Sequence, residues 1–258
     1  MWIDSHCHLD APEFDPDRDQ VIAAARAAGV EAQIVPAIRA ANWATLKTLC
    51  ERHSDLFPAY GLHPMYLADH QPEDLRSLRD WIERERPLAV GECGLDFYVP
   101  DLDADAQRHF LRGQLDLAAE FDLPVILHAR KAVDAVLLEL RRYAGRLRGV
   151  VHSFSGSAEQ AQQLFRIGFC LGIGGPVTYE RAQRLRRLVV DMPLDHLLLE
   201  TDAPDQPPCW ARGQRNTPAS LVQIAAQIAE MRGMEMDELA RVTQANARRV
   251  FSLPAAIR

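Results

Sequence analysis

The sequence predicts an α/β fold, namely a single (β/α)8 barrel that spans residues 1–258 as one domain. Three observations lead to this prediction. The length of 258 residues is close to the roughly 250 residues typical of such barrels. Short apolar segments alternate with longer amphipathic ones along the chain, and no proline- or glycine-rich linker divides them. The alternative is an open, doubly wound parallel sheet, which shows the same alternation.

Eight short apolar segments are the predicted strands. They contain little polar alternation, as expected for parallel strands that are covered on both faces. In chain order, these segments are Trp2–Asp4, Ala32–Pro36, Phe57–Leu62, Leu88–Gly91, Pro124–Leu127, Gly149–Val151, Phe169–Ile173 and His196–Leu199.

Helix signals lie between these strands. Asp15-Pro16 followed by an alanine-rich segment and Gly29 indicates an N-cap, a first-turn proline and a C-terminal glycine. Ser157 and Gln160 have the spacing of a capping box, and Gly168 ends that helix. Further helices are expected over Pro72–Arg86, Asp103–Phe121, Pro176–Val190, Pro218–Met231 and Met236–Val250.

The charge composition narrows the functional classes. Lysine and arginine total 29 and aspartate and glutamate 36, so the net charge is 29 − 36 = −7. This excludes a strongly basic nucleic-acid coat protein but not a nucleic-acid enzyme, because bound metal ions can supply positive charge. Only Lys47 and Lys131 are lysines.

The cysteines and the apolar segments bear on the compartment. The five cysteines are an odd number without a CxxC pair, which favours a reducing compartment. No apolar segment approaches the roughly 20 residues needed to cross a membrane, and the N-terminus lacks the features of a signal peptide. We therefore expect a cytoplasmic protein that does not associate with membranes. We also expect it to be a monomer.

Histidines and carboxylates follow several of the apolar segments. The carboxyl ends of barrel strands converge on one face, where active sites form. Four imidazoles and two carboxylates meeting there would suffice for two divalent ions (zinc, magnesium or manganese) if one carboxylate bridges them. Each residue alone has a structural alternative, such as a helix cap or an ion-pair partner. The six residues are His6, His8, Glu92, His128, His152 and Asp202.

The first strand end allows a more specific expectation. His6 and His8 are two residues apart in extended chain, so they face the same way and Cys7 faces the opposite way. Asp4 shares the face of the histidines one step deeper, and it is a candidate to orient an imidazole.

Seven segments along nearly the whole chain resemble the TatD deoxyribonuclease family, a branch of the metal-dependent amidohydrolase superfamily. They are IDSHCHLD at 3–10, GLHP at 61–64, VGECGLDFY at 90–98, PVILHAR at 124–130, VVHSFSGS at 150–157, LLLETDAP at 197–204 and RGQRNTP at 212–218.

This resemblance implies a barrel with a dinuclear metal site at the carboxyl ends of the strands. It assigns His6, His8 and Asp202 to one ion and His128 and His152 to the other, with Glu92 as the bridge. Other members of the superfamily bridge through a carboxylated lysine. Here neither lysine lies at the end of the fourth strand, which favours the TatD branch.

The function implied by the resemblance is hydrolysis of ester bonds by a metal-bridging water. We expect a deoxyribonuclease that acts as a 3′–5′ exonuclease on DNA 3′ ends, preferably single-stranded ones. Glu92 and Asp202 would be catalytic, with Asp202 orienting or deprotonating the water. The alternative is a metal-dependent esterase or amidohydrolase that acts on aminoacyl-tRNA or on a small carbonyl substrate.

Further candidates would contact the substrate. His63 could donate a hydrogen bond to phosphate or act as general acid, or it could simply stabilise its turn. Arg130 suits phosphate, or it pairs with a nearby carboxylate. Asp96 could bind a ligand histidine or a substrate 3′-hydroxyl, or cap a turn. In the long loop 203–217, Arg212 and Arg215 are candidates to bind phosphates.

Overall fold

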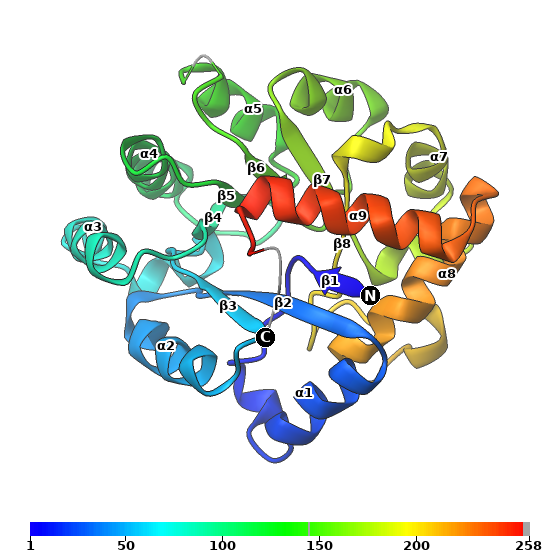
Figure 1. Cartoon of the computed structure of the whole chain (residues 1–258). Helices are drawn as coiled ribbons and strands as arrows, with labels where there is room; N and C mark the ends of the chain where they lie inside the picture. Colours follow the sequence, from blue (N-terminus) through cyan, green and yellow to red (C-terminus); the bar gives the residue numbers. More distant parts are fainter. Residues whose placement is uncertain (144, 255–258) are drawn as a thin grey trace.

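The computed structural model describes residues 1–143 and 145–254. Within these residues, parallel strands alternate with helices from one end of the chain to the other (Figure 1). The strands are β1 (Trp2–Asp4), β2 (Val30–Pro36), β3 (Leu56–Ala59), β4 (Val90–Asp96), β5 (Val125–Arg130), β6 (Gly149–Val151), β7 (Phe169–Ile173) and β8 (Leu197–Leu199). The helices are α1 (Arg18–Ala27), α2 (Trp43–Arg52), α3 (Asp74–Glu85), α4 (Ala104–Glu120), α5 (Val133–Arg141), α6 (Ala158–Arg166), α7 (Gln183–Asp191), α8 (Leu221–Arg232) and α9 (Met236–Phe251).

The strands form two parallel sheets, β1-β2-β3 and β4-β5-β6-β7-β8. Backbone hydrogen bonds join the sheets at both edges. Tyr60, just after β3, accepts a bond from Gly91 in β4 at 2.9 Å, and Ser5, just after β1, donates to Leu199 in β8 at 2.9 Å. The strands therefore form a ring surrounded by helices (Figure 1). This confirms the predicted (β/α)8 class and excludes the open sheet.

The predicted strand positions are correct, but several ends differ. Three strands, β1, β6 and β7, have the predicted bounds. In contrast, β4 runs on to Asp96 and β5 to Arg130, so the polar residues expected after these strands lie within them. At the mouth of a barrel, polar side chains are compatible with strand backbone because they face the site rather than the apolar core.

The helix predictions need more correction. Gln183–Asp191 forms α7, but Pro176 belongs to a short 3-10 segment, Gly175–Thr178, so the expected helix 176–190 is interrupted. Asp15 does not cap α1, because its carboxylate binds the Arg18 side chain at 2.6 Å and the helix begins three residues later. The capping box of Ser157 and Gln160 is present at the start of α6. Helices α2 and α5 were not predicted.

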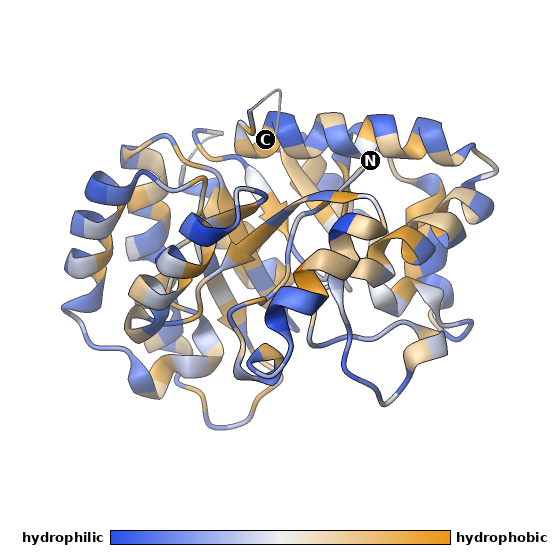
Figure 2. Cartoon of the chain, turned by 60° about the horizontal axis from the view of Figure 1, so that its bottom comes forward, coloured by the Kyte–Doolittle hydropathy of each residue, from blue (hydrophilic) through white to orange (hydrophobic). Residues whose placement is uncertain are grey.

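The interior of the barrel is an apolar cluster closed at one end by the last helix. Ile3, Ile34, Ile126 and Leu198 from the strands pack in one cluster with Phe251 of α9. Figure 1 shows α9 lying across this end of the ring, and Figure 2 shows that apolar residues concentrate on the inner strands. Because α9 covers the amino ends of the strands, the opposite end, formed by the carboxyl ends, is available for a site.

Candidate metal centre

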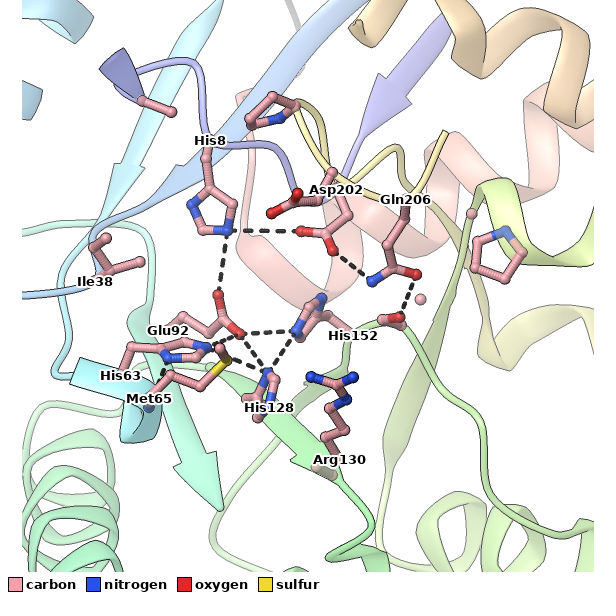
Figure 3. A pocket seen from close by; sticks show the side chains of 18 of the residues that line it. His8, Ile38, His63, Met65, Glu92, His128, Arg130, His152, Asp202 and Gln206 are labelled. Atoms are coloured by element: carbon pink, nitrogen blue, oxygen red, sulfur yellow. Dashed lines mark hydrogen bonds and ion pairs between the residues drawn. The ribbon is translucent and has the colours of Figure 1, made fainter. Parts of the chain in front are cut away.

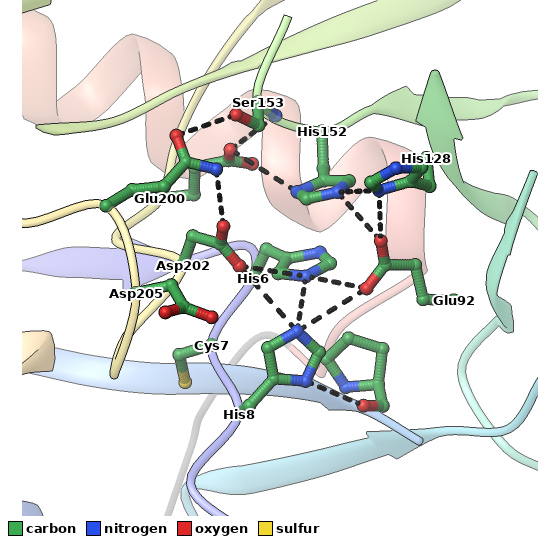
Figure 4. A network of polar contacts seen from close by, with 12 residues as sticks. His6, Cys7, His8, Glu92, His128, His152, Ser153, Glu200, Asp202 and Asp205 are labelled. Atoms are coloured by element: carbon green, nitrogen blue, oxygen red, sulfur yellow. Dashed lines mark hydrogen bonds and ion pairs between the residues drawn. The ribbon is translucent and has the colours of Figure 1, made fainter. Parts of the chain in front are cut away.

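The six predicted ligands meet at the carboxyl ends of the strands (Figure 4). They come from the segment after β1, from β4 and β5, and from the turns after β6 and β8. Residues nearly 200 positions apart become neighbours because β8 lies beside β1 in the ring. The backbone strengthens this junction, since Asp202 donates its N–H to the carbonyl of His6 at 2.9 Å.

One group of donor atoms surrounds a single point near β1 and β8. His6 Nε2 lies 3.2 Å from His8 Nε2 and 3.2 Å from Glu92 Oε2. Asp202 Oδ1 lies 3.5 Å from His6 Nε2 and 3.6 Å from His8 Nε2. Ligands about 2.0–2.1 Å from a tetrahedral ion stand roughly 3.3–3.4 Å apart. The spacing of this group therefore fits a divalent ion.

The other oxygen of Glu92 faces a second group. Its Oε1 atom lies 3.1 Å from His128 Nδ1, 2.8 Å from His152 Nε2 and 2.9 Å from His63 Nε2. The two oxygens of one carboxylate thus point into separate donor groups, as Figures 3 and 4 show. This is the arrangement that a bridging ligand requires.

The electrostatics of Glu92 support a cation at this position. Glu92 is 1% exposed, and its Oε2 atom accepts no hydrogen bond within the described structure. A buried carboxylate is costly unless cationic neighbours or a bound metal ion neutralise its charge. Burial alone would raise the pKa of Glu92, but the surrounding histidines, His152 first, hold it well below the usual value. The carboxylate is therefore ionised and suited to bind metal.

The hydrogen bonds of two histidines determine which nitrogen faces the centre. His8 Nδ1 lies 3.2 Å from the carbonyl of Pro36, and His128 Nε2 lies 2.8 Å from Asp96 Oδ2. Each of these nitrogens must donate, because its partner can only accept. Without a metal ion, burial lowers the pKa of each ring, but the hydrogen bond to Glu92 raises the pKa of His8 to about 9 and those to Asp96 and Glu92 raise the pKa of His128. With an ion bound, each ring would be neutral and would direct the lone pair of its other nitrogen toward that ion. These are the tautomers that metal ligands need.

His63 has the opposite arrangement. Its Nδ1 atom accepts the N–H of Met65 at 3.1 Å, so the proton of the neutral ring is on Nε2. Burial lowers the pKa of His63 to about 4, which keeps the ring neutral. His63 therefore presents an N–H donor to the centre rather than a lone pair. It also has a structural contact, since its carbonyl binds the His70 ring at 2.8 Å.

Asp4 acts differently from the sequence-based expectation. Its carboxylate is fully buried and accepts from the backbone N–H of His6 at 3.2 Å and from Thr201, at 3.0 Å from the backbone and 2.6 Å from the hydroxyl. It therefore connects the ends of β1 and β8 through the backbone, and the structure shows no bond from it to an imidazole. Residue spacing placed Asp4 on the correct face but could not show which atoms of its neighbours it would meet.

Three further polar residues, Glu200, Ser153 and Gln206, complete the network, and of these the sequence singled out only Ser153, as a possible substrate contact or turn residue. Glu200 accepts the backbone N–H of Ser153 at 2.5 Å. Ser153 Oγ donates to Gln206 Oε1 at 2.8 Å, and Gln206 Nε2 donates to Asp202 Oδ2 at 2.5 Å. These bonds leave Asp202 Oδ1 facing His6 and His8. Glu200, in the same ETD triplet as Asp202, could have been suspected from sequence, whereas the position of Gln206 depends on the fold of its loop.

The centre lies in a cavity of about 710 Å³ (Figure 3). Arg130 lines one side, and among the described residues it has no carboxylate partner. Asp10, Glu13 and Asp205 line the side formed by the segments after β1 and β8. No ion pair is formed by these three carboxylates in the described chain. The cavity is therefore polar: Arg130 and Arg39 line it, Arg39 being paired with Asp69 at 2.9 Å, together with three carboxylates that follow β1 and β8.

The remaining predicted substrate contacts have different outcomes. Asp96 combines two of its expected roles, because it binds His128 and also accepts the backbone N–H of Tyr98 at 2.8 Å. Arg212 follows the 3-10 segment Cys209–Ala211 and does not line the cavity. Arg215 is also outside the cavity lining, and both of its terminal nitrogens bind the Asp17 carboxylate, at 2.9 and 2.6 Å. The sequence could not reveal this distant partner.

Comparison with known proteins agrees with the family resemblance of the sequence motifs. A family model described as TatD related DNase matches residues 3–252. An uncharacterized metal-dependent hydrolase, YjjV from Escherichia coli K12, is 40% identical, and the match covers 98% of each chain. A protein named 3′-5′ ssDNA/RNA exonuclease TatD from Erwinia tasmaniensis is 36% identical, with 97% of this chain and 100% of that one covered.

Solved structures agree with the sequence matches. The crystal structure of the YjjV TatD homologue from Escherichia coli K12 superposes with a TM-score of 0.94 and 98% coverage of each chain. A TatD family hydrolase from Entamoeba histolytica shares the fold with a TM-score of 0.85 at 20% identity, covering 97% of each chain. No helix of the residues described here is long and apolar enough to span a membrane.

Proposed function

This chain belongs to the TatD related DNase family and is a metal-dependent hydrolase, and we propose that it cleaves phosphodiester bonds of single-stranded DNA as a 3′–5′ exonuclease. One observation carries the proposal: the two oxygens of Glu92 face separate donor groups at the base of a cavity that Arg130 also lines. The name of the Erwinia relative supports the choice of substrate.

Two divalent ions would occupy the centre in this proposal. His6, His8 and Asp202 would hold one, His128 and His152 the other, and Glu92 would bridge them. Zinc, magnesium and manganese are the candidates, because imidazole suits zinc and phosphodiester chemistry often uses the other two. When bound, such ions activate water at neutral pH and neutralise charge on phosphate oxygens.

Three side chains have separate roles in the proposed reaction. Asp202 orients the attacking water or accepts a proton from it, because its buried carboxylate lies beside the first group of donor atoms. His63 donates its Nε2–H to an oxygen of the phosphate or of the leaving group, which follows from its tautomer. Arg130 pairs with a phosphate oxygen, since no protein carboxylate neutralises it in the described chain.

The distribution of charge in the cavity supports action at the end of a strand rather than within it. A phosphate is attracted to the side of Arg130 and repelled by Asp10, Glu13 and Asp205. A terminal deoxyribose carries a free hydroxyl group and no further phosphate, so it suits the acidic side. A strand that continued past this side would bring phosphates against three carboxylates, which disfavours internal cleavage.

A metal-resolved cleavage assay tests the proposed function. A 5′-labelled single-stranded oligonucleotide should shorten one nucleotide at a time from its 3′ end with zinc, magnesium or manganese. The Glu92→Ala variant should be at least about a thousandfold slower, because it removes the bridging carboxylate. Aminoacyl-tRNA and small esters are assayed in parallel. Failure on all DNA together with cleavage of one of these carbonyl esters would replace the nuclease proposal by the esterase alternative.

A further inference from the structure

The turn after β4 presents two large aromatic side chains to solvent beside the cavity. Phe97 is 38% exposed and Tyr98 is 56% exposed. Tyr98 is the most exposed phenylalanine, tyrosine or tryptophan in the described chain, whereas half of these residues are buried. The proposed chemistry at the metal centre gives these two residues no role.

Tyr98 is paired with the arginine that lines the cavity. The guanidinium carbon of Arg130 lies 3.7 Å from the centre of the Tyr98 ring, a distance at which a cation is attracted to the ring face. The strand register brings them together, because Asp96 of β4 is paired with Arg130 of β5 and Phe97 donates its N–H to the Arg130 carbonyl at 2.9 Å. Figure 3 shows the Arg130 side chain beside His128 and His152.

A single buried carboxylate links this aromatic turn to the metal centre. Asp96 Oδ1 accepts the backbone N–H groups of Tyr98 and Val99, at 2.8 and 3.0 Å, and Asp96 Oδ2 accepts from His128 Nε2 at 2.8 Å. Asp96 is fully buried. The group that orients a proposed metal ligand therefore also holds the backbone of Tyr98, so the ring stands at a defined position relative to the centre.

We propose that Tyr98 and Arg130 form a stacking site for an unpaired nucleobase, on a nucleotide next to the one being removed. Arg130 covers one face of the Tyr98 ring and reaches phosphate, while the exposed remainder of the ring offers an apolar surface to a base. Aromatic rings bind bases of any sequence in this way, but only where the bases are unpaired. The inference rests on the proposed function and gives a physical reason for the proposed preference for single strands.

The test combines a protein variant with a modified substrate. Tyr98→Ala should raise the KM for a single-stranded oligothymidylate about tenfold and change kcat less than twofold. Tyr98→Phe keeps the ring and should behave as the unmodified protein. Trp210→Ala is the matched control, because Trp210 is 42% exposed but does not line the cavity.

The substrate series then contains an abasic residue at each of the last four positions in turn. At one position, removal of the base should raise the KM of the unmodified protein about tenfold, and Tyr98→Ala should add little to that loss. Equal effects of Tyr98→Ala on intact substrate and on every abasic substrate would overturn the stacking site. An unchanged KM in Tyr98→Ala would also overturn the stacking site.

A binding measurement separates this inference from the proposed function. The anisotropy of a fluorescein-labelled oligothymidylate is followed with metal-free protein in a chelator, so that no cleavage is needed. Weaker binding by Tyr98→Ala than by Tyr98→Phe supports the stacking site even if no oligonucleotide is cleaved. Cleavage together with identical binding by both variants leaves the nuclease intact and overturns the stacking site.

Discussion

Individual hydrogen bonds decide the roles of the histidines in this centre. His128 donates its Nε2–H to Asp96, which leaves Nδ1 to face Glu92 at 3.1 Å, where it would bind a metal ion. His63 receives the N–H of Met65 and so keeps a proton toward the same carboxylate. Two neighbouring imidazoles with identical chemistry therefore differ in function, one as a proposed ligand and the other as a proposed donor.

The assignment of His63 as a donor predicts a separation of metal binding from turnover. His63→Ala should lower kcat about a hundredfold without changing the number of ions bound, and His63→Gln should recover part of the rate through its amide N–H. The ion content of purified protein is measured by elemental analysis alongside the rate. His128→Ala is the control that should lose one ion, and loss of an ion from His63→Ala would identify His63 as a ligand.

At the scale of elements, the strands carry more of the site than their apolar segments suggest. Glu92 and Asp96 lie inside β4 and His128 lies inside β5, because inward-facing positions at the barrel mouth accept polar side chains. The missed helices have a different cause. The side chains of Asn42 and Ala132, which precede α2 and α5, form no capping bond. These helices exist mainly because the barrel buries their apolar faces.

The packing around β7 predicts that residue 172 must be glycine. A Cβ atom at Gly172 would lie 1.9 Å from Glu200 Oε2, and Glu200 is buried and bound to Ser153. Gly172→Ala should therefore lower the free energy of unfolding by about 1–3 kcal/mol, measured by urea denaturation. Gly113→Ala is the matched control, because its Cβ meets only the Leu75 side chain, which can shift. Equal stability of the two variants would contradict the argument.

At the scale of the whole molecule, ring closure unites the two ends of the sequence. The segment after β1 carries His6, His8, Asp10 and Glu13, and the segment after β8 carries Asp202 and Asp205. Because these strands are neighbours, the acidic residues gather on one side of the cavity. The net charge of −7 therefore does not oppose a polyanionic substrate everywhere, since local charge guides binding.

The ring of strands closes around a cluster of buried carboxylates and histidines. We therefore predict that bound metal stabilises the entire barrel. A chelator should lower the melting temperature by several degrees, because ions at a hundred times their Kd contribute about 2.7 kcal/mol and each kcal/mol shifts Tm by about 2–4 °C. Differential scanning fluorimetry with readdition of each metal measures the shift. Glu92→Gln should show a smaller response. An unchanged Tm after chelation of the metal-loaded, unmodified protein would contradict a buried metal site.

A feature of this protein could be predicted from sequence when it depends on local patterns, and could not when it depends on contacts between residues far apart in the chain. The clustering of the six candidate ligands could be predicted because each stands at or near the end of an apolar segment and barrel geometry brings such ends together. Arg215 could not be placed, because its Asp17 partner is 198 residues away in sequence. Asp4 was expected at an imidazole but binds backbone N–H groups, whose positions depend on two strands meeting.

The sequence by itself determined the fold class, the strand order and the residues that could bind metal, since these depend on local apolar patterns and on residue type. Only the tertiary structure decided that each oxygen of Glu92 faces its own donor group, that His63 points a proton inward, and that Gln206 holds Asp202. The physical reason is that proton positions and carboxylate orientations depend on hydrogen-bond partners from other strands. Those partners become neighbours only when the ring closes.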